Sequence, residues 1–213
     1  MYSLKNYPCS LIAILRGLAL SEVPMVGQVL FDAGFRLLEV PLNRPGALDA
    51  IGALIRIAPA DALIGGGTVL TQEDVDVVKH AGGQFMVSPN CEPDVIRHAV
   101  DNGLMAVPGI CTPTEAFRAL AAGAHGLKLF PAEMTPPAIV KALRSVLPTG
   151  TPVLPVGGIH PHHMAAYIDA GASGFGIGGQ LYRPAIERAA LKRAAESFME
   201  ARRAIIAGLH ETD

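Results

Sequence analysis

The chain has 213 residues, of which 50% are hydrophobic and 17% are charged, so we expect one compact domain spanning residues 1–213 with a sizeable core. The net charge is −2 and the basic residues form no long run, which argues against nucleic acid or an anionic membrane as a partner. No stretch approaches the roughly 20 apolar residues that span a bilayer, and the three cysteines form no CxxC pair, so we expect a cytoplasmic protein with reduced thiols.

Short apolar runs alternate with segments of helical periodicity from the first residues onward. The start of the chain, MYSLKNYPCSLIAILRG, predicts a first strand and not a signal peptide. A longer helix is expected to close the chain over residues 184–207. We expect the apolar runs to form strands at 10–16, 36–42, 62–69, 84–89, 104–110, 126–131, 152–158 and 174–179.

Residues that start and stop helices flank the segments between these runs. Ser21, Thr71 and Thr112 are candidate N-caps, because a side-chain hydroxyl accepts from the free N–H groups of the first helical turn. The candidate C-terminal stops are Gly34, Gly103, Gly123 and Gly171. Continuous apolar strands that each precede a helix predict a parallel sheet covered by helices, and eight such units predict a closed (β/α)8 TIM barrel. An open doubly wound sheet is the alternative fold.

A lysine interrupts the apolar run within HGLKLFPAE, at Lys128. Side chains alternate along a strand, so Gly126, Lys128 and Phe130 share a face, and Gly126 is expected to leave space beside the amine. One interpretation is a structural ion pair with Glu39. The other is an amine nucleophile, because burial and a nearby cation such as Arg16 lower the pKa of a lysine, and a neutral amine attacks a ketone to form a Schiff base.

Glu39, late in the second run, is the carboxylic acid best placed to serve such an amine. Schiff-base chemistry needs protons moved at several atoms in turn, and one buried carboxyl group can carry them. A plain salt-bridge acid is the alternative interpretation. An ionised Glu39 would raise the pKa of Lys128, whereas burial and Arg16 would lower it, and the sequence leaves both outcomes open.

Glycines crowd the ends of the last two predicted strands, in VGGIHP (156–161) and GIGG (176–179). Their backbone N–H groups could approach an anion there, at the usual phosphate position of such barrels. Tight turns would explain each glycine pair equally well. The glycines concerned are Gly157, Gly158, Gly178 and Gly179.

The closely spaced histidines of HPHH, at 160–163, do not predict a metal site. Pro161 suits the first turn of a helix, from which the histidines point in different directions, and no further ligands are evident. We expect neither a metal nor another cofactor.

Six motifs, LLEVPLN, GGGTVLT, VSPN, PGICTPTEA, GLKLFPAE and VGGI, lie in this order between LIAILRG and GGQLYRP. Together they resemble the class I 2-keto-3-deoxy-6-phosphogluconate aldolase family, and its galactonate-specific branch in particular. The resemblance implies a metal-free homotrimer of (β/α)8 barrels that cleaves 2-dehydro-3-deoxy-6-phosphogalactonate to pyruvate and glyceraldehyde 3-phosphate. It also implies that Lys128 forms the Schiff base with pyruvate and that Glu39 is the general acid and base.

The resemblance assigns binding roles to the remaining site residues. Arg16 and Thr68 would hold the carboxylate of pyruvate. Pro89 and Phe130 would form walls of the pocket. The four glycines named above would hold the phosphate of the aldehyde half.

Three positions bear on the sugar acid and its phosphate. Gluconate-type members of the family commonly carry EVTLR and TGGI, where this chain has EVPLN and VGGI. Asn43 thus replaces an arginine, and Val156 replaces a threonine hydroxyl that could bond the C4 hydroxyl by which the two epimers differ. Both positions match the galactonate branch. Gln180 departs from the serine or aspartate often found beside the phosphate glycines.

Other functions remain as alternatives at this point. A gluconate-specific or dual-specificity aldolase is the nearest one. A phosphate-barrel epimerase or isomerase would need paired acids or a metal, and Glu39 is the one well-placed carboxylate in the predicted strands. A barrel that binds sugar phosphates without catalysis would keep its function after the substitution Lys128→Ala.

Overall fold

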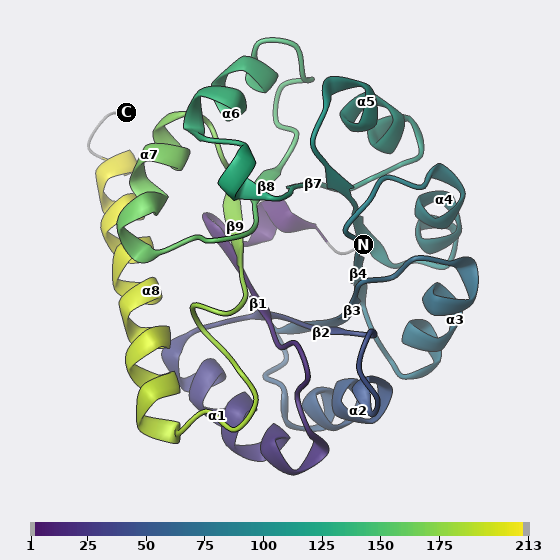
Figure 1. Ribbon diagram of the computed structural model, residues 1–213, viewed down its shortest axis with the longest axis vertical. Helices are drawn as coiled ribbons and strands as arrows, with labels where there is room; N and C mark the ends of the chain where they lie inside the picture. Colours follow the sequence, from purple (N-terminus) through teal and green to yellow (C-terminus); the bar gives the residue numbers. More distant parts are fainter. Residues whose placement is uncertain (1–2, 211–213) are drawn as a thin grey trace.

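The computed structural model describes residues 3–210 as a curled parallel sheet with helices around its outside (Figure 1). The strands are β1 (Ser10–Ile14), β2 (Leu37–Pro41), β3 (Leu63–Gly67), β4 (Phe85–Val87), β5 (Met105–Val107), β6 (Gly109–Ile110), β7 (Leu127–Leu129), β8 (Val153–Pro155) and β9 (Gly174–Ile177). The helices are α1 (Val23–Ala33), α2 (Ala47–Ile57), α3 (Gln72–His80), α4 (Pro93–Asp101), α5 (Pro113–Ala121), α6 (Pro137–Arg144), α7 (Met164–Asp169) and α8 (Arg188–His210). Within this part of the chain, no helix combines the length and the apolarity needed to cross a bilayer.

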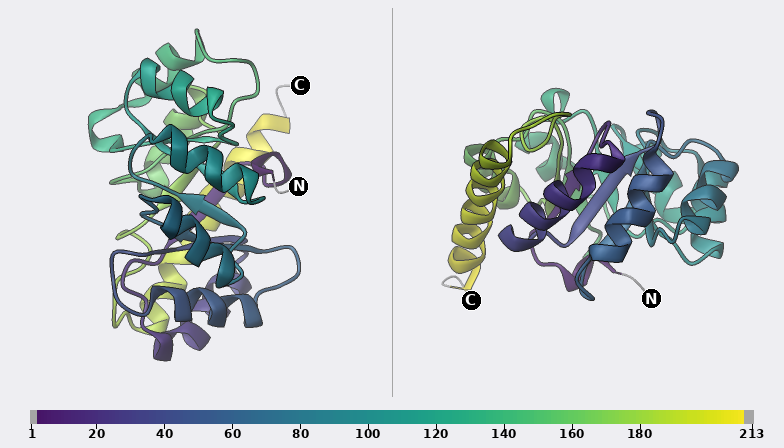
Figure 2. Two further views of the ribbon diagram at one scale, coloured as in Figure 1. Left: turned by 90° about the vertical axis from the view of Figure 1, so that its right-hand side faces the viewer. Right: turned by 90° about the horizontal axis from the view of Figure 1, so that it is seen from below.

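The strands pair in two hydrogen-bonded groups. Six strands follow the order β5-β4-β3-β2-β1-β9, and three follow the order β6-β7-β8, with parallel pairing throughout. The first strand lies beside the last, with Ser10 in register with Gly174. Helix α8 packs along α1 and α7 on the outside of the sheet (Figure 2). The expected parallel sheet covered by helices is confirmed.

The expected strand at 104–110 is divided in two, because Pro108 has no N–H to donate to a ladder. Before the proline, β5 pairs with β4, and after it β6 pairs with β7, so the chain passes here from one group of strands to the other. The Pro108 carbonyl still accepts from the N–H of Lys128 at 2.8 Å. At the opposite junction, Val156 after β8 pairs with Gly176 of β9.

The helix boundaries confirm most of the expected caps. Thr71 and Thr112 each accept from the backbone N–H three residues on, and each expected stop glycine follows a helix with a positive φ. Ser21 is wrong as a cap: it lies in a 3-10 helix, Leu20–Glu22, and α1 begins only at Val23, with a proline in its first turn. The last helix begins at Arg188 and not at 184, because Ala185 has a left-handed φ of 59°.

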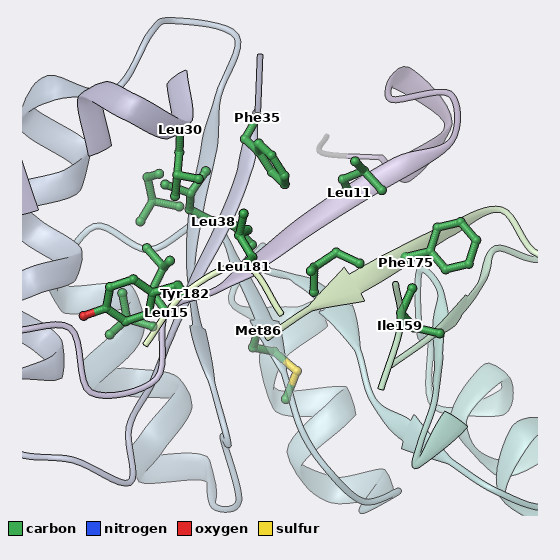
Figure 3. Close-up of a cluster of buried hydrophobic side chains, with 14 of the residues drawn as sticks. Leu11, Leu15, Leu30, Phe35, Leu38, Met86, Ile159, Phe175, Leu181 and Tyr182 are labelled. Carbon is green, nitrogen blue, oxygen red and sulfur yellow. The ribbon is translucent and has the colours of Figure 1, made fainter. Parts of the chain in front are cut away.

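Alternation along the strands separates an outer from an inner set of side chains. Outer residues pack between sheet and helices, and Figure 3 shows Leu15, Leu30, Phe35 and Leu38 among them. The inner cluster is Leu4, Ile12, Leu37, Leu63, Phe85, Val87, Met105, Val107 and Leu154. Two residues beyond Leu37, Glu39 faces the same inner side, and Lys128 lies in register with Leu154. The strands therefore direct both groups inward.

The cap at the start of α5 provides a test of this local structure. Thr112→Ala removes the hydroxyl that accepts from Glu115 N and donates to its carboxylate. We expect the free energy of unfolding to fall by about 1 kcal/mol, which lowers Tm by about 2–4 °C. Urea unfolding and a thermal scan measure both. The exposed Thr149→Ala is the control and should stay within about 0.5 kcal/mol of wild type; an equal loss in both variants would contradict the capping role.

Candidate functional site

A cavity of about 500 Å³ opens where the strands end. Four of its lining residues stand at or just after the ends of strands. Ile14 is the last residue of β1, Thr68 follows β3, Phe130 follows β7 and Val156 follows β8. Ten of the eleven residues predicted for the site are among its lining residues. These are Arg16, Glu39, Thr68, Lys128, Phe130, Val156, Gly157, Gly158, Gly178 and Gly179.

The exception is Pro89, which does not line the cavity. Strand β4 ends at Val87, and the Pro89 carbonyl lies directly against Gly109 of β6. The prediction that Pro89 forms a pocket wall is therefore wrong in this structure. Its backbone fills the space that a side chain at Gly109 would need, which is a packing role at the junction of the two strand groups.

Lys128 is buried, with 8% of its surface exposed, and its Nζ lies 4.8 Å from the centre of the Phe130 ring. Among residues 3–210, no carboxylate oxygen lies within 4.0 Å of this amine, so the alternative interpretation, an ion pair with Glu39, does not form as a contact. Burial lowers the pKa of Lys128, Arg16 lowers this pKa further, and Glu39 raises it, with the net shift downward. The balance that the sequence left open is therefore a lowered pKa.

The expectation that Gly126 leaves space beside the amine is wrong. A side chain at Gly126 would collide with Leu4 and approach Pro152, so this position is already filled. Leu4 belongs to the inner cluster, at the other end of β7 from the cavity. The room around Lys128 is the cavity itself.

Glu39 is the more deeply buried partner, with 2% of its surface exposed. Its Oε2 is buried and has no hydrogen-bond partner among the described residues. Gly67 on the neighbouring strand makes room for the carboxyl group, because a Cβ there would lie 2.7 Å from the same oxygen. A buried carboxyl oxygen without a partner is costly to ionise, so this group needs a ligand or a proton.

Burial raises the pKa of Glu39 to about 7, although the charges of Lys128 and Arg16 act in the opposite direction. A carboxyl group with such a pKa exists in both protonation states near neutral pH. It can therefore donate a proton in one step and accept one in another.

Arg16 and Thr68 lie at the rim of the same space. Arg16 is exposed and forms no ion pair within the described chain, so its guanidinium is free for an anion. Thr68 holds a left-handed φ of 54°, which is rare for a β-branched residue and is typical of functional positions.

The glycine-rich end of the cavity carries two charged residues that sequence reasoning did not assign to the site. The exposed carboxylate of Glu133 lies against Gly157 and Gly158, where side chains would collide with it. Arg183 lines the cavity from the loop after β9. Each follows a strand by only a few residues, within GLKLFPAE and GGQLYRP, and that position was the signal that could have identified them.

The three histidines at 160–163 pack on one another, with the rings of His162 and His163 centred 4.1 Å apart. None of the three is among the cavity-lining residues. Across residues 3–210, no group of three His, Cys, Asp or Glu side chains is arranged to hold a metal ion.

The chain is similar to proteins described as KDPG, KHG or KDPGal aldolases. Residues 5–195 match the family model described as KDPG and KHG aldolase. The 2-dehydro-3-deoxy-6-phosphogalactonate aldolase of Escherichia coli strain K12 is 47% identical over 188 residues, covering 87% of this chain and 91% of that protein.

Two solved structures extend the comparison to three dimensions. One, described as native KDPGal, has a TM-score of 0.90 and 43% identity, covering 92% of this chain and 96% of that one. The other is the KDPG aldolase of Legionella pneumophila, with pyruvate captured as a covalent carbinolamine intermediate. It has a TM-score of 0.80 and 25% identity, covering 96% of this chain and 98% of that one.

The buried carboxyl group predicts an unusual dependence of stability on pH. The pKa of Glu39 is about 7 in the folded chain and 4.5 when exposed, so between these values the folded state binds more protons than the unfolded state. The free energy of unfolding therefore falls as pH rises through this window. Glu39→Gln removes this effect, so we expect its stability relative to wild type to rise by about 3 kcal/mol from pH 4 to pH 8.

Urea unfolding at pH 4, 5, 6, 7 and 8 measures the difference between Glu39→Gln and wild type. Glu200→Gln, at an exposed position on α8, is the matched control and should differ from wild type by less than about 0.5 kcal/mol at every pH. A difference for Glu39→Gln that stays flat across the range would contradict a carboxyl group kept neutral by burial.

Proposed function

The chain belongs to the KDPG and KHG aldolase family, and on that premise we propose that it is a class I aldolase that cleaves 2-dehydro-3-deoxy-6-phosphogalactonate to pyruvate and D-glyceraldehyde 3-phosphate. The observation that carries the proposal is the buried amine of Lys128, free of a contact ion pair, in one cavity with the protonatable carboxyl group of Glu39. The name and the identity of the Escherichia coli relative support the choice of substrate.

In the first half of the reaction, the neutral amine of Lys128 attacks the C2 ketone of the substrate and forms a carbinolamine. Loss of the former ketone oxygen as water gives a protonated Schiff base. Glu39 supplies the proton that lets this water leave, and afterwards it is a carboxylate. The carbinolamine captured in the Legionella pneumophila relative supports such a step in this family.

In the second half, the Glu39 carboxylate accepts the proton of the C4 hydroxyl. The C3–C4 bond breaks, its electron pair moves through C3 to the iminium nitrogen as an enamine, and C4 becomes the carbonyl of glyceraldehyde 3-phosphate. Glu39 then returns its proton to C3. Water hydrolyses the protonated Schiff base to release pyruvate and the neutral lysine, and the proton freed in this step returns to the Glu39 carboxylate. Water is lost once and consumed once, so the net reaction is cleavage alone.

The remaining lining residues bind the two halves of the substrate. Arg16 holds the pyruvate carboxylate as a charge-assisted hydrogen-bond donor, with Thr68 beside it. Phe130 forms an apolar wall next to the amine, in keeping with its 4.8 Å separation from Nζ. The glycine N–H groups that follow β8 and β9 receive the phosphate.

Val156 favours the galactonate epimer because it offers no hydrogen bond to the C4 hydroxyl. Its side chain lines the cavity and packs against Gly176 of β9. Asn43 is exposed and is not among the lining residues, so its side chain takes no part in this choice.

The assembly and location are part of the same proposal. The strands close into one (β/α)8 barrel within a single domain, and the bonds at Pro108 and Val156 support closure at both junctions. The chain acts as a homotrimer in the cytoplasm. Large exposed apolar side chains support burial against further copies, and three free cysteines support a reducing compartment.

Borohydride reduction in the presence of pyruvate tests the mechanism. We expect wild type to gain one reduced pyruvate adduct on Lys128, located by peptide mass spectrometry. Lys128→Ala should lose the adduct, with cleavage falling by at least about 1,000-fold. The exposed Lys141→Ala is the control and should behave as wild type. An adduct that persists in Lys128→Ala, or cleavage that survives there, would refute the Schiff base at this residue.

Kinetics with the two epimeric phosphates test the choice of sugar acid. We expect wild type to have the higher kcat/KM with the galactonate epimer. Val156→Thr adds a hydroxyl at the same volume, and one neutral hydrogen bond should shift the kcat/KM ratio toward the gluconate epimer by about 2- to 10-fold. Val156→Ala removes volume without adding a hydroxyl and should not shift it in that direction. A wild-type preference for the gluconate epimer would refute the assignment.

A further inference from the structure

The cavity has an unequal distribution of positive charge. Three cationic side chains line it within the described residues: Arg16, Lys128 and Arg183. The proposed function uses the first two at the keto-acid end. The glycine-rich end, where the phosphate would sit, is otherwise lined by glycine backbone, the neutral Gln180 and the carboxylate of Glu133.

We propose that Arg183 is the side chain that binds the phosphate group of the substrate. This inference rests on the proposed function, because a phosphorylated substrate is its premise. Arg183 would supply the charged contact to the phosphate that the neutral side chain of Gln180 does not supply.

The position of Arg183 is fixed by the loop that carries it. The N–H groups of Leu181 and Tyr182 both donate to the Gly178 carbonyl, at 2.8 and 3.0 Å, so the chain turns back immediately after the glycine pair. Leu181 and Tyr182 are then buried in the outer core, and Figure 3 shows the Tyr182 ring beside Leu15. The turn keeps Arg183 next to Gly178 and Gly179.

Glu22 holds the other side of the same loop. Its carboxylate accepts from the Tyr182 hydroxyl at 3.1 Å and from the Ala185 N–H at 2.8 Å, which are the positions on either side of Arg183 and Pro184. It also accepts from Ala19 N at 3.2 Å, so the loop is tied to the segment between β1 and α1. Burial and the Glu22 charge raise the pKa of Tyr182, so its hydroxyl remains a donor.

The backbone around Arg183 is therefore held in place, whereas its side chain is free. The guanidinium is exposed and forms no ion pair or hydrogen bond within residues 3–210. Arg36 and Arg97 elsewhere on the surface are each paired with an aspartate. A fixed loop with a free guanidinium suits a phosphate, because the planar fork can donate two parallel hydrogen bonds to its oxygens.

The opposing charge of Glu133 makes such a cation necessary. Its carboxylate lies against Gly157 and Gly158 and would repel a phosphate dianion held by their N–H groups. Without Arg183, the neutral N–H dipoles alone would have to overcome this repulsion. With Arg183, the positive charge of its guanidinium offsets the negative charge of Glu133.

Steady-state kinetics of Arg183→Gln with phosphorylated and unphosphorylated forms of the substrate test the proposal. We expect KM for the phosphorylated substrate to rise by about 10- to 100-fold, as for loss of one charge-assisted contact. The inhibition constant of inorganic phosphate should rise in the same direction. Kinetics with the unphosphorylated 2-dehydro-3-deoxygalactonate should not change. Arg183→Lys keeps the charge without the fork and should give an intermediate KM.

Arg188→Gln is the matched control, because it removes the same charge from an exposed arginine that does not line the cavity. It should behave as wild type. An unchanged KM and phosphate inhibition constant in Arg183→Gln would overturn the proposal, and so would an equal loss with both substrates, which would indicate a structural role. Failure of wild type to trap pyruvate on Lys128 would refute the proposed function instead, and inorganic phosphate binding would still test Arg183.

Discussion

The burial of one amine and one carboxyl group on the inner side of the same curled sheet, without contact between them, is the constraint on which the rest of the site depends. An ion pair in contact would stabilise both charges, leaving Lys128 protonated and Glu39 unable to donate. Held apart in a poorly solvated space, each group shifts toward its neutral form. The same burial thus suits the amine to nucleophilic attack and the carboxyl group to proton donation, and it costs folding stability that the surrounding core must offset.

The three consecutive glycines of β3 show how closely the neighbouring structure fits this pair. A side chain at Gly65 would collide with Phe85, one at Gly66 with Val78 of α3, and one at Gly67 with the carboxyl group of Glu39. The first two positions allow strand and helix to pack closely. The third leaves space for the carboxyl group of Glu39, so one short motif serves both the core and the candidate site.

Features set by local periodicity could be predicted from the sequence. The alternation of side chains along β2 and β7 directs Glu39 and Lys128 to the inner side of the sheet. The positions of the strand ends in the sequence predicted most of the residues that line the cavity. Features set by distant contacts could not. The Pro89 carbonyl lies against Gly109, and Leu4 occupies the space beside Gly126. Pro108 divides the apolar run 104–110, which the sequence predicted to be one strand, into β5 and β6. Glu133 and Arg183 lie in loops, whose course no periodicity specifies.

The pairing of β1 with β9 has a consequence for how the chain is made. Strand β1 is synthesised well before its partner on one side, β9 (Gly174–Ile177), which follows the eight other strands of the described residues. Until then β1 presents an unpaired edge in an incomplete sheet, which is a site where nascent chains associate wrongly. Cooperative folding must also await this long-range closure, so the molecule folds more slowly than its many short helices would allow. The geometry that completes the cavity also makes folding of the nascent chain depend on the synthesis of β9.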